Sequence, residues 1–231
     1  MYEGEYLNGE RNGKGKEYYW NYFDEYIKFE GEYLNGERNG EGKEYKWYGL
    51  LLYEGEFLNG ERNGKGKYYP EDDLEYRKFE GEYLNGERNG KGREYDYKDR
   101  LLFEGEFLKG KRWNGKGKQY DDFDNLIFEG EYLNGKKWNG KGYDKKGNII
   151  FEIKEGKGKN IKEYNKYNYN IIFEGEYLNG ERNGKGKEYY SKNKLKFEGE
   201  YLNGKKWNGK GYDKKGNIIY ERKDGRKIKI N

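Results

Sequence analysis

Cysteine and histidine are both absent from this 231-residue chain, and proline occurs once. Without cysteine no disulfide can form, so we expect a reducing compartment such as the cytoplasm. Without histidine the chain lacks the commonest general base, and without cysteine it lacks a thiol nucleophile. Ser191 is its single serine. Because this inventory offers no nucleophile placed beside a base, we expect a protein that is not an enzyme.

Long apolar runs are absent as well. No stretch approaches the roughly 20 apolar residues that a membrane-spanning helix requires. Met1 leads directly into a repeat and not into a signal peptide. We therefore expect a soluble protein.

What the chain does contain is charge, glycine and aromatic rings. Charged residues make up 40% of the chain, hydrophobic residues 32% and aromatic residues 19%. Dense charge with few aliphatic side chains is typical of disorder. Here, however, the aromatic residues and glycines recur at a regular spacing, which predicts a repeat protein instead.

The repeat unit is FEGEYLNGERNGKGKEYY, as found at 173–190. Successive copies start 24 to 27 residues apart, except for one step of 45 residues across a degenerate unit. The copies begin at Tyr2, Phe29, Tyr53, Phe79, Phe103, Phe128, Phe173 and Phe197.

Each unit has the pattern of a β-hairpin. In FEGEYL, alternate positions place the two aromatic residues and the glycine on one face of a strand and the glutamates on the other. The LNGERN segment with its Asn-Gly pairs predicts a loop, and GKGKEYY predicts the return strand. Stacked hairpins would bury an aromatic core, made of the eight starting residues together with Tyr6, Tyr33, Phe57, Tyr83, Phe107, Tyr132, Tyr177 and Tyr201.

The spacing also suggests internal boundaries. We expect six repeats over 1–150, a degenerate, cap-like unit over 151–165, and two further repeats with a degenerate C-terminal cap over 166–231. The fold class predicted is all-β, an elongated single-layer antiparallel array of β-hairpins.

The pattern Tyr/Phe-x-Gly-x-Tyr/Phe-x-x-Gly-x-x-x-Gly-x-Gly resembles the membrane occupation and recognition nexus (MORN) repeat over nearly the whole chain. Two positions depart from that family: the second aromatic residue, usually Trp, is Tyr or Phe (Tyr6, Phe57), and the usual loop His is Asn (Asn12, Asn183). The resemblance implies a scaffold protein, often near a membrane or the cytoskeleton.

Other site types find little support. Three segments, Gly110–Gly117, Gly135–Gly142 and Gly204–Gly211, are similar to phosphate-binding loops, but glycine occupies the position of the magnesium-binding Ser or Thr. The sequence lacks the residue spacing of an EF-hand loop, so we expect no metal site. We expect no cofactor and no small-molecule substrate, and the small excess of positive charge argues against nucleic acid as a partner.

Three repeats have a loop that is one residue longer and carries a tryptophan after two cations. Such loop tips suit an anionic membrane surface or an acidic protein, whereas the structural alternative is that the indole folds back on its own hairpin. The candidate contact residues are Lys111, Arg112, Trp113, Lys136, Lys137, Trp138, Lys205, Lys206 and Trp207.

Charge is unevenly distributed. Residues 136–162 carry nine lysines against three acids, and 205–231 carry ten cations against three acids, while the whole chain is only +4. Such asymmetry steers encounters with anionic surfaces, although lysines at edge strands also prevent aggregation. Two hypotheses follow: a non-catalytic scaffold that binds a protein partner through the repeat ribbon, or a peripheral module that contacts anionic phospholipid through the Lys/Trp tips.

Overall fold

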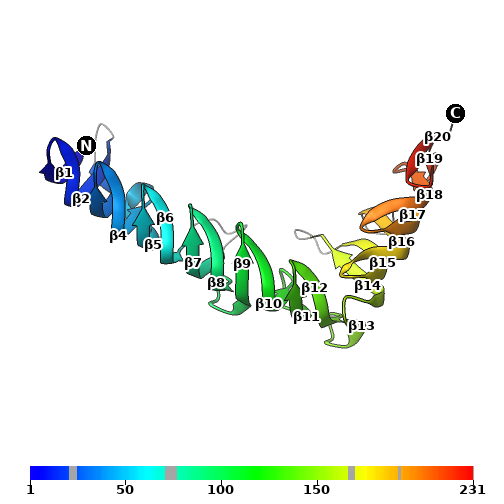
Figure 1. Cartoon of the computed structure of the whole chain (residues 1–231). Coiled ribbons are helices and arrows are strands. Elements are labelled where there is room, and N and C mark those ends of the chain that lie inside the picture. The colour runs from blue at the N-terminus through cyan, green and yellow to red at the C-terminus, as the bar shows by residue number, and fades with distance from the viewer. Residues whose placement is uncertain (21–24, 71–76, 166–169, 192–193, 231) are drawn as a thin grey trace. The chain divides into compact units, whose positions relative to one another are not determined.

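The computed structural model describes residues 1–20, 25–70, 77–165, 170–191 and 194–230. Within these ranges nearly every element is an antiparallel β-strand, and the single helical element is a short 3-10 turn, η1 (Trp47–Gly49). The predicted all-β array of single-layer hairpins is confirmed (Figure 1).

The strands of the described residues form two open sheets, and within each sheet every strand pairs with its neighbours in chain order. The first sheet contains β1 (Tyr2–Leu7), β2 (Glu10–Trp20), β3 (Glu25–Leu34), β4 (Glu37–Tyr45), β5 (Leu51–Leu58), β6 (Glu61–Tyr68), β7 (Lys78–Leu84), β8 (Glu87–Tyr95), β9 (Leu101–Leu108), β10 (Lys111–Tyr120), β11 (Leu126–Leu133), β12 (Lys136–Tyr143) and β13 (Ile149–Ile153). The second sheet contains β14 (Gly158–Tyr164), β15 (Ile171–Leu178), β16 (Glu181–Ser191), β17 (Lys194–Leu202), β18 (Lys205–Tyr212), β19 (Ile218–Lys223) and β20 (Arg226–Lys229).

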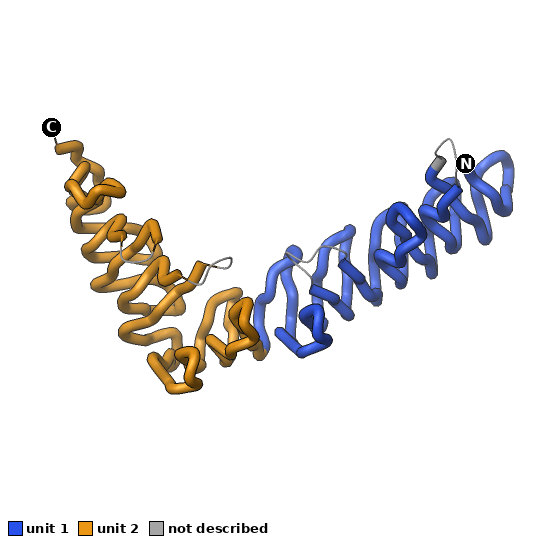
Figure 2. Tube along the Cα trace, turned by 180° about the vertical axis from the view of Figure 1, so that it is seen from behind, with its two compact units in different colours: residues 1–115 blue, residues 116–231 orange. Residues whose placement is uncertain are grey.

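The chain divides into two compact units, unit 1 (Met1–Gly115) and unit 2 (Lys116–Asn231) (Figure 2). The break between the two sheets lies within unit 2, after β13 and before β14, where Lys154 and Lys157 form an isolated bridge. This break falls inside the degenerate unit expected over 151–165. The domain limits at 150 and 165 stay predictions, and residues 166–169 lie outside the described residues.

The hairpin turn is tighter than the predicted LNGERN loop. Asn179 and Gly180 both have positive φ, 53° and 72°, and β16 begins directly after them at Glu181. Two residues with positive φ at this place are typical of a type I′ turn, whose twist matches that of the flanking strands. The second Asn-Gly pair is therefore part of the return strand, where Gly184, with φ of 89°, lies beside a shift in register.

The core of unit 1 is a continuous row of aromatic rings in edge-to-face contact. Phe57 shows the arrangement: its ring centre lies 5.3 Å from that of Tyr53 in its own hairpin and 5.0 Å from that of Phe29 in the preceding one. Phe57 thus joins two hairpins, and the same holds for Tyr33, Tyr83, Phe107 and Tyr201. Twelve of the predicted core residues are buried: Phe29, Tyr33, Tyr53, Phe57, Phe79, Tyr83, Phe103, Phe107, Phe128, Phe173, Phe197 and Tyr201.

The prediction that Tyr6 belongs to the core was wrong, because its side chain is 59% exposed. It belongs to β1, the edge strand of the first sheet, so no preceding hairpin supplies the second ring that Phe57 has. Tyr2, Tyr132 and Tyr177 are half-buried. Tyr132 and Tyr177 pack against a cluster of unit 2 formed by Phe128, Phe151, Ile153 and Ile161. The sequence pattern did not place the two isoleucines in the core.

Candidate functional site

The two faces of each hairpin have different chemistry. In antiparallel pairs, residues directly opposite each other share a face. Phe29 lies opposite Glu44 and Gly31 opposite Gly42, whereas Glu30 lies opposite Lys43. One face therefore carries the aromatic rings and the other carries rows of charged side chains.

On the aromatic face a cation covers the first ring of every repeat. Arg38 places its guanidinium carbon 4.2 Å from the centre of the Phe29 ring, and it donates hydrogen bonds to Glu44 at 2.7 Å and to Glu17 of the preceding hairpin at 2.9 Å. The same place is taken in the other repeats by Arg11, Arg62, Arg88, Arg112, Lys137, Arg182 and Lys206. These cations and their glutamates join successive hairpins.

Glu94 is the most buried acid of this network, with a side chain that is 4% exposed. It accepts a hydrogen bond from Arg112 at 2.6 Å and pairs with Arg77 and Arg88. Burial alone would raise the pKa of this carboxyl, but the three guanidinium groups outweigh burial and hold its pKa below the ordinary value. The network is thus a set of permanent charges that stabilises the fold.

Three of the predicted contact residues belong to this network. Arg112, Lys137 and Lys206 lie over the rings of Phe103, Phe128 and Phe197 at 5.1, 4.0 and 4.9 Å. Lys137 also donates to Gln119 at 2.9 Å, and Lys206 pairs with Glu188 at 3.0 Å. Burial lowers the pKa of Lys206. These side chains already have partners within the fold.

The three tryptophans do not lie at hairpin tips. Trp113, Trp138 and Trp207 are half-buried and lie within β10, β12 and β18, two residues beyond the turn. The ring of Trp138 is so close to Gly156 that a Cβ there would be 2.7 Å from it, and the ring of Trp207 lies similarly against Gly225. The indoles of Trp138 and Trp207 pack on the turn of the following hairpin and not, as the structural alternative expected, on their own hairpin. Whether the tryptophans also contact a partner stays a prediction.

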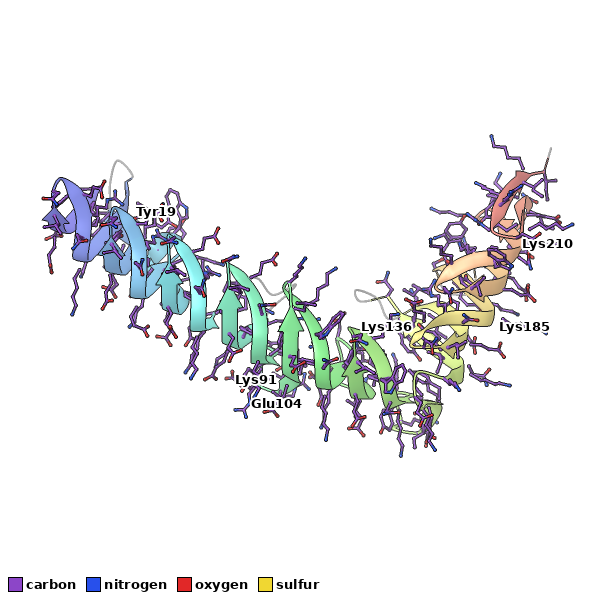
Figure 3. All side chains as sticks on the ribbon, in the orientation of Figure 1. Tyr19, Lys91, Glu104, Lys136, Lys185 and Lys210 are labelled. Atoms are coloured by element: carbon purple, nitrogen blue, oxygen red, sulfur yellow. The ribbon has the colours of Figure 1, made fainter. Side chains whose placement is uncertain are left out.

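The first cation of each pair is the residue next to the turn. Lys111 and Lys205 are exposed, and the half-buried Lys136 pairs with Glu181 at 2.8 Å. Figure 3 labels Lys136 at this place. Of the nine predicted contact residues, these three lysines therefore lie closest to the hairpin tips.

A groove runs along the charged face of unit 1, and sequence reasoning missed it. Its volume is about 1310 Å³, and glycines, glutamates and cations of nine consecutive strands line it, from Glu3 on β1 to Glu106 on β9. Lys91 and Glu104, labelled in Figure 3, are two of its lining residues. The signal is present in the sequence as the alternation of Glu-Gly-Glu with Lys-Gly-Lys, but that pattern alone does not distinguish a groove from a solvated face.

The charges in this groove alternate in sign from strand to strand. One row follows a strict order: Glu3, Lys16, Glu30, Lys43, Glu54, Lys67, Glu80, Arg93 and Glu104. The second row pairs Lys14 with Glu32, Lys65 with Glu82 and Lys91 with Glu106. Glu41 breaks the order, because it lies opposite another acid, Glu56.

The hairpin tips carry a further feature that was not predicted. A leucine precedes every Asn-Gly or Lys-Gly turn, and its side chain is exposed in all eight repeats. The leucines are Leu7, Leu34, Leu58, Leu84, Leu108, Leu133, Leu178 and Leu202.

Comparison with known proteins identifies the repeat. The family pattern described as MORN repeat matches residues 2–19, 29–46, 53–73, 79–98 and 173–194. No curated protein matches the chain. Among the described residues there is no helix with the length and apolar character needed to cross a bilayer, and no cluster of three or more potential metal-ligating side chains. MORN repeats are modules of interaction and membrane association, and the five matches agree with the hairpin geometry: the chain carries MORN repeats in these five segments.

Proposed function

We propose that the chain is a non-catalytic scaffold that binds an extended segment of a protein partner in the groove of unit 1. The observation that carries the proposal is the groove itself, which is continuous over nine strands and lined by the same residue types in each repeat. A pocket for a small molecule would instead gather a few convergent polar groups at one place.

The groove offers an extended chain two kinds of contact. Its floor is backbone at glycines such as Gly31 and Gly42, where a Cβ would point to the Phe29 ring on the opposite face, so the floor is flat. Its walls supply cations and acids in alternation. The pairs between them are exposed, for example Lys67 with Glu80 at 3.6 Å, and pairs of this kind contribute little to stability. A partner can therefore replace them at small cost.

The charge pattern also indicates what the partner carries. A segment with alternating charges would match the first row, and a cation would be favoured beside Glu41 and Glu56, where two acids lie opposite each other. Such contacts steer association and weaken with salt. Catalysis is not part of the proposal, because the chain has no histidine or cysteine and its groove acids recur unchanged in each repeat.

A peptide library tests the proposal. We expect selection on the folded chain to enrich extended sequences of alternating charge, whose affinity falls at least tenfold in the variant Lys16→Glu/Lys67→Glu. The matched control is Lys185→Glu/Lys187→Glu in unit 2, which leaves the groove unchanged. Enriched peptides that bind all three proteins equally would contradict the proposal.

Anionic phospholipid is a second candidate partner, favoured by the tips of three repeats. Exposed Leu108 lies beside Lys109 and Lys111, and exposed Leu202 lies beside Lys205. The tip of the hairpin between β11 and β12 is similar, with exposed Leu133. Leucine with lysine at one tip suits an interface of acyl chains and anionic headgroups.

Co-sedimentation with vesicles tests this candidate. We expect binding to anionic vesicles and not to neutral ones, weaker at physiological than at low salt. The variant Lys111→Glu/Lys136→Glu/Lys205→Glu should lose binding. Replacement of Trp113, Trp138 and Trp207 by Ala should change binding less, since the indoles are half-buried. The reverse order of effects would restore the tryptophans as the contact site.

A further inference from the structure

We propose that the hairpin tips of the first four repeats form a docking edge for one amphipathic, basic α-helix of a partner protein. This edge is distinct from the groove. Its tips, called the acidic leucine tips, each combine an exposed leucine with a glutamate directly opposite it across the turn. The pairs are Leu7 with Glu10, Leu34 with Glu37, Leu58 with Glu61, and Leu84 with Glu87.

The exposure of these leucines contrasts with the burial of the aromatic core. Leu7, Leu34, Leu58 and Leu84 are 57%, 50%, 48% and 50% exposed, although the first aromatic residue of each repeat after the first is completely buried. Single exposed leucines are ordinary on protein surfaces. A leucine at the same place in four consecutive hairpins forms a row, and a row of apolar side chains indicates a binding edge.

The row is rigid because hydrogen bonds join each turn to the hairpin before it. The backbone N–H of Gly36 donates to the carbonyl of Arg11, that of Gly60 to Arg38, and that of Gly86 to Arg62, all at 2.9 Å. The turns therefore cannot separate without breaking backbone bonds. The distance between successive leucines is held at two strand spacings, about 9.6 Å.

That distance is close to the repeat length of an amphipathic helix. Seven residues of α-helix rise about 10.5 Å, so a helix inclined by about 25° to the row advances about 9.6 Å per heptad along it. The strands of a sheet are rotated relative to one another, and a row of hairpin tips in such a sheet is compatible with a helix at this angle. A helix of about 22 residues, with one apolar residue per heptad, would contact all four leucines.

The acidic residues at the tips indicate which side chains should flank the apolar stripe of the partner helix. Glu10, Glu37, Glu61 and Glu87 are exposed, and none of them forms an ion pair within the described parts of the chain. Lysine or arginine beside the apolar residue of each heptad would pair with them. The same glutamates repel an anionic membrane. At the fifth tip, Lys109 and Lys111 replace the Asn and Glu of the earlier tips, so the acidic edge ends there.

Two synthetic peptides test the proposal on the full chain. The first has 22 residues, helix-forming, with leucine at every seventh position and lysines beside it. The second has the same composition with leucine at every fifth position. Fluorescence anisotropy should show the first peptide binding at least tenfold more tightly than the second, and more weakly as salt is raised. Equal affinities would overturn the proposal.

Variants locate the contact. Leu34→Ser/Leu58→Ser/Leu84→Ser should reduce the affinity of the heptad peptide at least tenfold, while circular dichroism shows that the fold is kept. The matched control, Leu178→Ser/Leu202→Ser, changes tips of unit 2 and should leave the affinity unchanged. So should the groove variant Lys16→Glu/Lys67→Glu, which separates this edge from the groove. Equal losses in the triple variant and in either control would overturn the proposal.

Binding to vesicles tests the alternative that the leucine row contacts a lipid surface and not a helix. We expect no binding of anionic phospholipid vesicles that depends on Leu34, Leu58 and Leu84. If the triple variant abolishes vesicle binding while the heptad peptide binds wild type and triple variant alike, the leucine row is a lipid contact and the proposal is wrong.

Discussion

Arg112 donates a hydrogen bond from Nε to Oε2 of Glu94 at 2.6 Å, and so joins two consecutive hairpins. The buried Glu94 carboxylate also faces Arg77 and Arg88. Glu94→Gln keeps the shape of the side chain but leaves these cations without their counter-charge. Removing one partner of a buried ionic network is costly, and we expect the free energy of unfolding to fall by about 3 kcal/mol.

Urea denaturation measures this change. Glu104→Gln, in the groove, is the control, because the Glu104 side chain is 52% exposed and its pair with Arg93 is a surface pair; its effect should stay below about 0.5 kcal/mol. Equal effects of the two substitutions would show that burial does not strengthen the network.

Acid should weaken the fold through the same carboxylates. The pKa values of Glu17, Glu94, Glu163 and Glu188 are all lowered, since the neighbouring cations outweigh the effect of burial. A carboxyl whose pKa is lower in the folded state stabilises that state above its unfolded pKa, and this stability is lost as the pH falls through the folded value. We expect the urea midpoint to be level from pH 7 to about pH 5 and to fall below the ordinary glutamate value of 4.5. A midpoint that stays level to pH 3 would contradict this.

Two tyrosines at the same repeat position should respond oppositely to loss of the hydroxyl. The Tyr83 hydroxyl is buried without a hydrogen-bond partner in the described residues, whereas Tyr33 donates to Glu17 at 3.0 Å. Tyr83→Phe should raise the free energy of unfolding by about 1 kcal/mol, and Tyr33→Phe should lower it by about 1 kcal/mol. Phe57 and Phe107 occupy the same position in other repeats and show that phenylalanine fits. Thermal unfolding of both variants would reveal a wrong sign.

Glycine is required at Gly92 for space and at Gly86 for backbone conformation. A Cβ on Gly92 would lie 2.5 Å from the buried Phe79 ring, while Gly86 has φ of 78° and nothing within 4 Å of a Cβ. Gly92→Ala should cost about 3 kcal/mol, because the ring cannot move without disturbing the row. Gly86→Ala should cost only about 1 kcal/mol. Chemical denaturation that ranks the two in the opposite order would refute the steric account.

The tryptophans of unit 2, Trp138 and Trp207, should stabilise the folded state. Trp138 and Trp207 lie against the turn glycines Gly156 and Gly225, and these turns donate hydrogen bonds to the tryptophan carbonyls at 2.7 and 2.9 Å. Replacing either indole by Ala uncovers the next turn. We expect the free energy of unfolding to fall by about 2 kcal/mol, less than for a core aromatic residue because the indoles are half-buried. Leu202→Ala at a tip is the control, with little expected change. Indistinguishable unfolding curves for the tryptophan variants and wild type would favour a pure contact role.

Much of the fold could be predicted from periodicity. The alternation of Phe173, Gly175 and Tyr177 defines one face of a strand, and its recurrence requires neighbours that cover it. The turn was placed too broadly, because both Asn-Gly pairs offer residues that accept positive φ. Only the strand register shows that the pair at Asn179 forms the turn and that Gly184 lies within a strand.

The candidate site was harder to predict, because it depends on contacts between repeats. In the sequence, Arg112 and Lys206 look like free cations beside a tryptophan, yet each lies over a ring of its own hairpin and pairs with a glutamate of the preceding hairpin. Such partners lie 18 residues apart in the sequence, as for Glu94 and Arg112. The groove likewise exists only when nine strands lie side by side.

The pairing of Arg38 with Glu17 recurs as the pairing of Arg62 with Glu44 at the next junction. Consecutive hairpins thus present matching surfaces to one another. If recombination removed residues 29–52 in frame, Arg62 would meet Glu17 where Arg38 had been, and Phe57 would meet Tyr2. A gene for this protein can therefore gain or lose whole hairpins without creating an unmatched surface, and the number of hairpins in the array becomes an inherited variable of its own.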